Sequence, residues 1–380
     1  MIYLDNAATA YPKAPGVARS MYDYVEKVGA TINRSSYASA QEAGLVTLTL
    51  RERLCRLFGH PDPTRAVITP GATAGLNMVI KGLLRPGDHC IVSSMEHNAV
   101  MRPLVQLEKE GVSFDRASCD KEGRLELEKL PGLIRENTKL VVMAHASNVS
   151  GTVQDAEAVG KICAEHGIPF ALDAAQSAGH MDVDFGRFRL SALAVPGHKG
   201  LLGPQGIGAL LLDAQFAEKL TPLIAGGTGS ASDMEELPGW MPDRFESGTM
   251  NLPGIYGLET ALRYIEERGI ADLEAHERRL TRRFLDGLRS IKNVRLFGPY
   301  DLSARTGVIS IGFIRRDNAD AAWQLERDFG VLTRCGLHCA PSAHKTLESW
   351  PEGSVRFSIG YANTEADIDG ALEAIEATSS

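Results

Sequence analysis

The chain has 380 residues, and its 40 lysines and arginines against 48 aspartates and glutamates give a formal net charge of −8. This length is enough for two domains, and the 44% hydrophobic and 23% charged residues are typical of a globular protein rather than a disordered or fibrous one. The negative charge argues against nucleic acid or an anionic membrane as a partner, and no apolar run reaches the roughly 18 residues of a membrane helix.

The N-terminal residues do not have the pattern of a secretory signal. Asp5 stands where such a signal would need a basic segment followed by an apolar one. The six cysteines are spread thinly along the chain, unlike those of a secreted disulfide framework, so we expect reduced thiols. Together these features predict a cytoplasmic protein.

Short apolar runs alternate with longer amphipathic stretches between residues 66 and 212. This alternation is typical of βαβ units and predicts an α/β fold with a mostly parallel sheet of seven strands. The predicted strands are Arg65–Thr69, His89–Ser93, Val112–Arg116, Lys139–Ala144, Ile168–Leu172, Phe188–Val195 and Gly206–Leu212.

The chain changes character after the last of these strands. Residues 225–254 are rich in Gly, Pro and Met and have no clear period, which predicts a long loop, and such loops are uncommon unless they are functional. Beyond the loop we expect two helices and then a second, α+β domain. The predicted helices are Gly257–Glu267, Ile270–Ser290, Ala319–Phe329 and Glu365–Ala377, and the strands are Val294–Phe297, Gly307–Phe313 and Ser354–Ile359.

Three consecutive strands of the predicted sheet are followed by polar loops. Ligands of an open α/β sheet bind at the carboxyl ends of its strands, so the three loops predict one binding site. The polar side chains that they carry include Asn148, Asp173, Gln176, His198 and Lys199.

Asp173 and Lys199 are the charged groups of this candidate site. Asp173 directly follows an apolar run, where a carboxylate is costly without a cation beside it; the alternative is that it caps the next helix. Lys199 follows another such run, where burial would make it a nucleophile of lowered pKa; the alternative is a surface lysine among glycines.

A third feature lies upstream, where Thr69 ends a strand and Pro70-Gly-Ala-Thr-Ala-Gly75 opens a helical run. Backbone N–H groups at such a helix start can bind a phosphate, although the segment alone could be only a tight turn. It is neither a P-loop nor a dinucleotide-binding fingerprint. An aspartate, a lysine and a phosphate-binding helix start together predict pyridoxal 5′-phosphate, which needs a ring-nitrogen partner, a Schiff-base lysine and a phosphate site.

Several longer motifs extend over nearly the whole chain. In them the sequence resembles the class V aminotransferase family, and within it the cysteine desulfurase and selenocysteine lyase group. The resemblance implies a pyridoxal-phosphate transferase of fold type I, with a large domain over residues 16–255 and a small domain formed by residues 1–15 and 256–380. The motifs are Tyr3-Leu-Asp-Asn-Ala-Ala, Gly71-Ala-Thr, Glu96-His-Asn-Ala, His145-Ala-Ser-Asn, Asp173-Ala-Ala-Gln, Gly197-His-Lys-Gly, Glu246-Ser-Gly-Thr, Arg334-Cys-Gly-Leu-His-Cys-Ala and Val355-Arg-Phe-Ser-Ile-Gly.

The resemblance also implies roles for individual residues around the cofactor. Lys199 would form the Schiff base, Asp173 would hold the ring nitrogen and Gln176 would lie beside the ring hydroxyl. His97 would stack on the ring and transfer protons. The phosphate would be bound by Ala72, Thr73 and His198.

Substrate binding and dimerisation follow from the same resemblance. Asn148, which also belongs to the cofactor site, and Arg356 would hold the carboxylate of the amino acid, although Arg356 could instead lie on the surface face of a strand. Thr249 matches a threonine that reaches the phosphate of the neighbouring subunit. A homodimer with shared active sites is therefore implied.

Cys339 matches the cysteine that accepts the sulfur atom as a persulfide. A free cysteine is usually only a small buried hydrophobe, but the neighbouring Arg334 and His338 could favour a thiolate here. Cys335 lies four residues before it, a spacing that leaves a metal site or a regulatory disulfide as a minor alternative. We expect no metal.

One position departs from the family pattern. Pro196 stands where relatives commonly carry Ser or Thr, and it offers neither a hydroxyl nor an N–H to the phosphate. Either the cofactor binds more weakly, or another hydroxyl such as Thr228 or Ser230 replaces the missing one.

The sequence thus predicts an enzyme that converts L-cysteine to L-alanine and leaves a persulfide on Cys339, with a protein sulfur acceptor as a further partner. The nearest alternative is a relative on the same scaffold: a selenocysteine lyase acting on L-selenocysteine, another C–S lyase, or an aminotransferase or epimerase. The intact Cys339 loop favours sulfur transfer over the last two. An alternative of another class is a protein that only carries sulfur or docks a partner. The third, a zinc module at Cys335 and Cys339, ignores Asp173 and Lys199.

Overall fold

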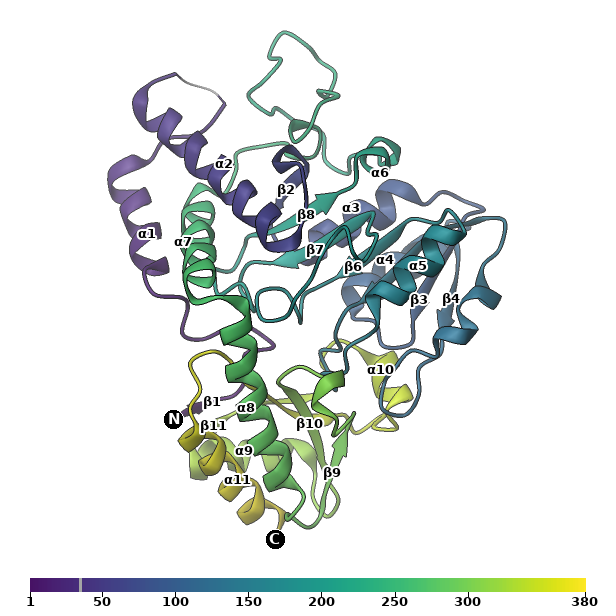
Figure 1. Cartoon of the computed structure of the whole chain (residues 1–380), viewed down its shortest axis with the longest axis vertical. Helices are drawn as coiled ribbons and strands as arrows, with labels where there is room; N and C mark the ends of the chain where they lie inside the picture. The colour runs from purple at the N-terminus through teal and green to yellow at the C-terminus, as the bar shows by residue number, and fades with distance from the viewer. Residues whose placement is uncertain (34–35) are drawn as a thin grey trace.

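The computed structural model describes residues 1–33 and 36–380. It contains two main sheets, one of seven strands and one of four, each with its own core (Figure 1). We call the part built on the seven-stranded sheet the large lobe and the part built on the four-stranded sheet the small lobe. Both chain termini lie in the small lobe (Figure 1).

The large lobe confirms the predicted α/β fold. Among its strands β8 alone runs antiparallel to its neighbours, and the others all run in one direction. Most of their side chains are buried on both faces, except in the edge strand at residues 113–117, and this burial explains the continuous apolar runs in the sequence. In spatial order the strands are β2 (Ala66–Thr69), β8 (Gly208–Leu212), β7 (Ala192–Pro196), β6 (Phe170–Asp173), β5 (Thr138–Ala144), β3 (His89–Ser93) and β4 (Ser113–Ala117).

Helices cover both faces of this sheet. On one face, alternate strand residues such as Val92 pack with α3 (Ala72–Leu83), α4 (Asn98–Glu108) and α6 (Ala214–Lys219). On the other face, residues such as Ile91 pack with three further helices. These are α2 (Ala38–Phe58), α5 (Ala156–Glu165) and α7 (Leu252–Arg268), with α1 (Val17–Asp23) beside α7.

The long loop predicted after the seventh strand is present, and it projects from the large lobe (Figure 1). It is shorter than predicted because α7 begins at Leu252 instead of Gly257. The Asn251 side chain accepts a hydrogen bond from the Gly254 N–H, and Pro253 fits the first turn of a helix. The sequence analysis took this Pro-Gly pair for part of the loop.

The small lobe is an antiparallel sheet with helices on one face. Helices α8 (Ile270–Leu288), α9 (Asn318–Phe329) and α11 (Glu365–Ser379) pack with the strands around Phe284, Phe357 and Ile368. In spatial order the strands are β12 (Arg334–Gly336), β13 (Ser354–Ser358), β10 (Val308–Phe313) and β9 (Val294–Phe297). β12, which has only three residues, is not among the strands predicted for this domain.

The N-terminal residues join the two lobes. β1 (Ile2–Tyr3) pairs with β11 (Val331–Leu332) in the small lobe, and the chain then crosses to α1 in the large lobe. The short helix α10 (Pro341–Thr346) follows the segment that carries Cys339. In the described part of the chain, no helix has the length and apolar character needed to cross a membrane.

Candidate active site

A cavity of about 440 Å³ opens at the carboxyl edge of the large sheet. It lies where the sequence predicted a site, at the ends of β5, β6 and β7 and the start of α3. Arg356, Cys339 and Thr249 do not line it. The predicted residues that do are Ala72, Thr73, His97, Asn148, Asp173, Gln176, His198 and Lys199.

Asp173 is the last residue of β6 and is buried. Its carboxylate accepts a hydrogen bond from the Ala175 N–H at 3.0 Å, so the helix-cap interpretation is right as far as it goes. The Asp173 carboxylate forms no ion pair with any described residue. Burial raises its pKa, whereas the positive charge of Lys199 acts to lower it. This carboxylate is therefore a buried acid with no ion-pair partner among the described residues.

Lys199 lies three residues beyond the end of β7, on the edge next to β6. Burial lowers the pKa of its amine to about 8, while Asp173 acts in the opposite direction. The amine has no hydrogen-bond or ion-pair partner in the described residues. The cavity thus holds an unpartnered acid and an unpartnered amine of lowered pKa.

The start of α3 forms the opposite end of the cavity. The N–H groups of a first helical turn have no partner within the helix, and here Ala72 and Thr73 line the cavity. His198 lies near them, but burial and the charges of Lys199 and Lys13 lower its pKa to about 4. Its imidazole is neutral at pH 7 and would offer a phosphate a hydrogen bond and no charge.

Pro196 also lines the cavity, as the last residue of β7. The two proposed replacements for its missing hydroxyl lie elsewhere in this chain. Thr228 and Ser230 are 3.0 Å apart through their hydroxyls and line a separate surface groove in the long loop. Within one copy of the chain, neither hydroxyl takes the place of the missing one.

His97 caps α4, because its Nδ1 accepts a hydrogen bond from the Ala99 N–H at 3.0 Å. Burial lowers the pKa of His97 to about 4, and the charges of Lys199 and Arg334 act in the same direction. The imidazole is therefore neutral, and this hydrogen bond assigns its proton to Nε2.

The N-terminal segment, residues 5–13, holds three of the predicted site residues, and we call it the strap. The Ala7 carbonyl accepts a hydrogen bond from Gln176 Nε2 at 3.0 Å. The Thr9 hydroxyl bonds to His198 Nδ1 at 3.1 Å, and the Asp5 carboxylate pairs with Arg356. The sequence analysis used this segment for the resemblance but assigned it no role. The signal that the sequence offered for this role was the polar pair Asp5 and Asn6 directly after the first four residues.

Arg356 lies on β13 and is buried, so the alternative of a surface-face arginine is wrong. Its Nη2 donates to Asp5 Oδ1 at 2.7 Å, and its Nη1 donates to the Asn148 carbonyl at 3.1 Å. Its Nε is buried and has no hydrogen-bond partner among the residues that the structure describes. The guanidinium is thus fixed on two sides and still has a free donor.

The segment that carries Cys339 is tied to the cavity rim. The Cys339 carbonyl accepts a hydrogen bond from the Asn98 N–H at 2.8 Å, and the His338 carbonyl accepts one from Asn148 Nδ2 at 2.7 Å. His338 and Cys339 both have positive φ, 47° and 58°, which is uncommon outside glycine and costs energy. These tertiary contacts hold the strained segment in place.

Of the two neighbours predicted to favour a thiolate, the structure supports only Arg334. Its Nη2 is 3.8 Å from Cys339 Sγ, and the sulfur is exposed. The expectation for His338 is wrong, because its ring is buried and bonded through Nε2 to Ser354, and burial lowers its pKa to about 2. His338 therefore carries no charge at neutral pH.

Cys335 packs partly against the core of the small lobe, whereas Cys339 is exposed. Neighbouring residues of a strand point to opposite faces, so Arg334 and Cys335 diverge. In the residues that the structure describes, no cluster of three or more His, Cys, Asp and Glu side chains could hold a metal. This geometry gives no support to a metal or disulfide at Cys335.

Thr249 is exposed in the long loop. Glu246, three residues before Thr249, ties this loop to the core of the large lobe. Its carboxylate pairs with Arg51 at 2.6 Å and accepts a hydrogen bond from the Ile68 N–H at 2.6 Å. Glu246 thereby provides an acceptor for one backbone N–H at the free edge of β2.

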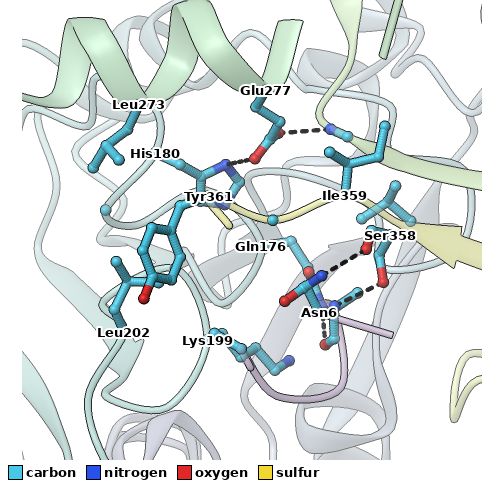
Figure 2. A pocket seen from close by; sticks show the side chains of 17 residues that line it. Asn6, Gln176, His180, Lys199, Leu202, Leu273, Glu277, Ser358, Ile359 and Tyr361 are labelled. Carbon is cyan, nitrogen blue, oxygen red and sulfur yellow. Dashed lines mark hydrogen bonds and ion pairs between the residues drawn. The ribbon is translucent and has the colours of Figure 1, made fainter. Parts of the chain in front are cut away.

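A second, smaller cavity of about 50 Å³ lies between the lobes and shares Gln176 and Lys199 with the first (Figure 2). His180 of the large lobe and Glu277 of α8 form an ion pair of 3.1 Å beside it. This pair raises the pKa of His180 against the opposing effect of burial. The two lobes are therefore held together by this ion pair as well as by the strap.

Comparison with known proteins agrees with this geometry. A family model described as aminotransferase class-V matches residues 2–370. A probable cysteine desulfurase of Methanothermobacter thermautotrophicus is 33% identical over 99% of this chain and 94% of its own length. The cysteine desulfurase IscS of Vibrio cholerae is 31% identical over 98% of this chain and 91% of its own length.

Solved structures give the same result for the fold. An apo cysteine desulfurase from Thermococcus onnurineus has a TM-score of 0.92 at 32% identity, covering 99% of this chain and 94% of that one. The cysteine desulfurase CsdA of Escherichia coli has a TM-score of 0.88 at 27% identity, with the same coverage.

Proposed function

Because the chain belongs to the class V aminotransferase family, we propose that it is a pyridoxal-phosphate-dependent cysteine desulfurase. It converts L-cysteine to L-alanine and receives the sulfur as a persulfide on Cys339. The observation that carries this proposal is the cavity with an unpartnered buried acid, Asp173, and an unpartnered amine, Lys199. The relatives named above carry the name cysteine desulfurase or probable cysteine desulfurase, and this chain matches them over almost their whole lengths.

The residues of the cavity fit pyridoxal 5′-phosphate. Asp173 needs a cation, and a protonated ring nitrogen supplies one. The N–H groups at the start of α3, with Ala72, Thr73 and His198, would hold the phosphate, and Gln176 would lie beside the ring. Lys199 would hold the cofactor covalently, and the cofactor would supply an electron sink for the α-carbon of an amino acid that takes the place of the lysine.

Two groups of the chain are suited to move protons at this site. Lys199, with a pKa of about 8, is partly neutral at physiological pH, so its Nζ can accept the α-proton once the substrate has displaced it. His97 is neutral and bears its proton on Nε2, so it donates hydrogen bonds rather than acting as a cation. Asp173 holds a positive charge in place while the proton is transferred.

Arg356 and Asn148 bind the substrate carboxylate in this proposal. The free Nε of Arg356 is a charged donor in a buried position, where an ionic hydrogen bond is strong. Asn148 lies between the two parts of the site: its carbonyl holds Arg356, its side chain holds the Cys339 segment, and it lines the cavity.

Cys339 accepts the sulfur. Its thiolate attacks the substrate sulfur, an S–S bond forms as the substrate C–S bond breaks, and the substrate β-carbon takes a proton. The products are alanine and a persulfide, so no external oxidant is required. Arg334, 3.8 Å from the sulfur, provides positive charge for the anionic form.

The active enzyme is a homodimer that would receive Thr249 from the neighbouring subunit at its phosphate site. Two facts support this: Thr249 is exposed, and the cavity of one copy lacks the hydroxyl that Pro196 cannot supply. A sedimentation measurement that finds an active monomer at assay concentration would refute it.

The exposed Cys339 sulfur is accessible to a protein sulfur acceptor. Cytoplasmic location stays a prediction.

The direct test supplies L-cysteine and L-selenocysteine to protein purified with pyridoxal 5′-phosphate and measures alanine from each. We expect alanine from cysteine in step with persulfide, and a yellow protein that borohydride bleaches. Alanine from selenocysteine alone would make the protein a selenocysteine lyase. A colourless protein with no turnover would leave only a sulfur-carrying or docking role.

A further inference from the structure

The strap brings a carboxylate to the buried arginine of the small lobe. Leu4 and the first two residues of the strap, Asp5 and Asn6, run beside β13, where Asp5 forms an isolated parallel bridge with Ser358. The Ser358 N–H donates to the Leu4 carbonyl at 2.7 Å, and Asn6 Nδ2 donates to the Ser358 carbonyl at 3.0 Å (Figure 2). Arg356 precedes Ser358 by two residues and therefore lies on the same side of the strand. Backbone pairing thus fixes Asp5 next to Arg356.

Arg356 needs such a partner. In the register of β12 and β13 it lies opposite Arg334, and like charges directly opposite each other are unfavourable. The Arg356 side chain is 1% exposed, so water does not screen the repulsion. Burial and Arg334 both lower the pKa of Arg356, whereas Asp5 opposes them. Among the described residues, Asp5 is the only carboxylate in contact with it.

We propose that Asp5 is a positioning residue for Arg356 and thereby sets the affinity of the enzyme for the α-carboxylate of its amino-acid substrate. The inference rests on the proposed function, in which Arg356 binds that carboxylate. Asp5 holds Nη2 and the Asn148 carbonyl holds Nη1, so the plane of the guanidinium is fixed and Nε remains free. Without Asp5, the substrate would have to orient a mobile arginine that Arg334 repels.

The test compares L-alanine with ethylamine, which is alanine without its carboxylate. Dissociation constants for both are read from the absorbance of the bound cofactor. Asp5→Asn should weaken alanine binding about ten-fold, the loss expected for one charged hydrogen bond, and leave ethylamine binding unchanged. In turnover, the KM for cysteine should rise by a similar factor while kcat stays within about three-fold.

Two control variants isolate the carboxylate. Asp23→Asn makes the same chemical change at an exposed ion pair in α1. Tyr3→Phe removes hydrogen bonds from the Tyr3 hydroxyl to the Asp5 and Thr9 carbonyls, but it leaves the Asp5 carboxylate and the backbone pairing of Leu4 and Asp5 with Ser358 in place. Both should bind alanine as the wild type does.

A double-mutant cycle shows whether the effect passes through Arg356. In an Arg356→Gln background, Asp5→Asn should have no further effect on alanine binding. Asp5→Glu, which keeps the charge but displaces it, should show a smaller loss and serves if Asp5→Asn does not fold. Equal losses for alanine and ethylamine, or wild-type alanine binding in both Asp5 variants, would overturn the proposal. If the wild type bound alanine but made none from cysteine, the proposed function would fail while the binding comparison still tested Asp5.

Discussion

The two halves of the candidate site are built in different ways. The cofactor half, with Asp173, Lys199 and the start of α3, comes from neighbouring elements of a single sheet. The other half, with Arg356 and Cys339, comes from the small lobe and is held to the cavity by the strap and by the loop around Asn148. Sheet topology alone positions the first half, whereas the second half depends on how two lobes pack together.

Because the two halves are built differently, each is expected to keep different properties when the other is disturbed. Asp173, Lys199 and the start of α3 would keep their places relative to one another if the lobes moved apart, because all three belong to the large lobe. Carboxylate binding and sulfur transfer would be lost, because both depend on contacts across the seam. Variants in the two halves should therefore fail in different ways.

Lys199→Ala should break the cofactor half completely and have the largest effect. In the proposed function the cofactor is bound covalently to this amine, so alanine production should fall to background and the borohydride-reducible colour should be absent. Spectra before and after borohydride and an alanine assay measure both. If the variant kept a reducible chromophore and turned over cysteine, the assignment of Lys199 would be wrong.

Cys339→Ser should break the other half and leave the first intact. Desulfuration of cysteine should stop, because a serine hydroxyl is a much poorer nucleophile than a thiolate. The protein should remain yellow with wild-type cofactor content, and its activity with selenocysteine should fall less than its activity with cysteine. Cys335→Ser is the matched control and should keep both activities. A loss of cofactor in Cys339→Ser would contradict the independence of the two halves.

Asp173→Asn should weaken the cofactor half without removing it. The substitution keeps the shape and the bond to the Ala175 N–H but removes the charge that the ring nitrogen needs. We expect the cofactor to bind and kcat to fall by roughly 10²-fold, a size typical of one electrostatic or acid–base contribution. Steady-state kinetics at saturating pyridoxal phosphate measure the change. Turnover within a few-fold of the wild type would show that ring protonation does not depend on Asp173.

The smallest effect concerns the apoprotein. The pKa of Lys199 is lowered to about 8, below the ordinary value of about 10.4. Between these values the unfolded chain binds more protons than the folded one, so the contribution of Lys199 to stability rises with pH across this window. Apoprotein Tm should therefore increase relative to Lys199→Met from pH 8 to 10. Lys13, whose pKa is also lowered to about 8, is present in both proteins and cancels. A Tm difference that stays constant would show that Lys199 is not buried as described.

The sequence predicted the cofactor half better than the other half, for a physical reason. Strand ends such as Asp173 can be recognised from local patterns, and parallel strands bring such ends to one edge. The ion pair of Asp5 and Arg356 spans 351 residues of sequence, and no local pattern indicates it. The neutral state of His338 likewise depends on burial beneath Ser354, which only the folded chain reveals.

The most direct test of a two-part desulfurase is to expose the holoenzyme briefly to L-cysteine and map its cysteine-containing peptides by mass. The account predicts one added sulfur atom on Cys339, in proportion to the alanine formed, and none on Cys335. An added sulfur on Cys335, or alanine formed without a persulfide on Cys339, would contradict it.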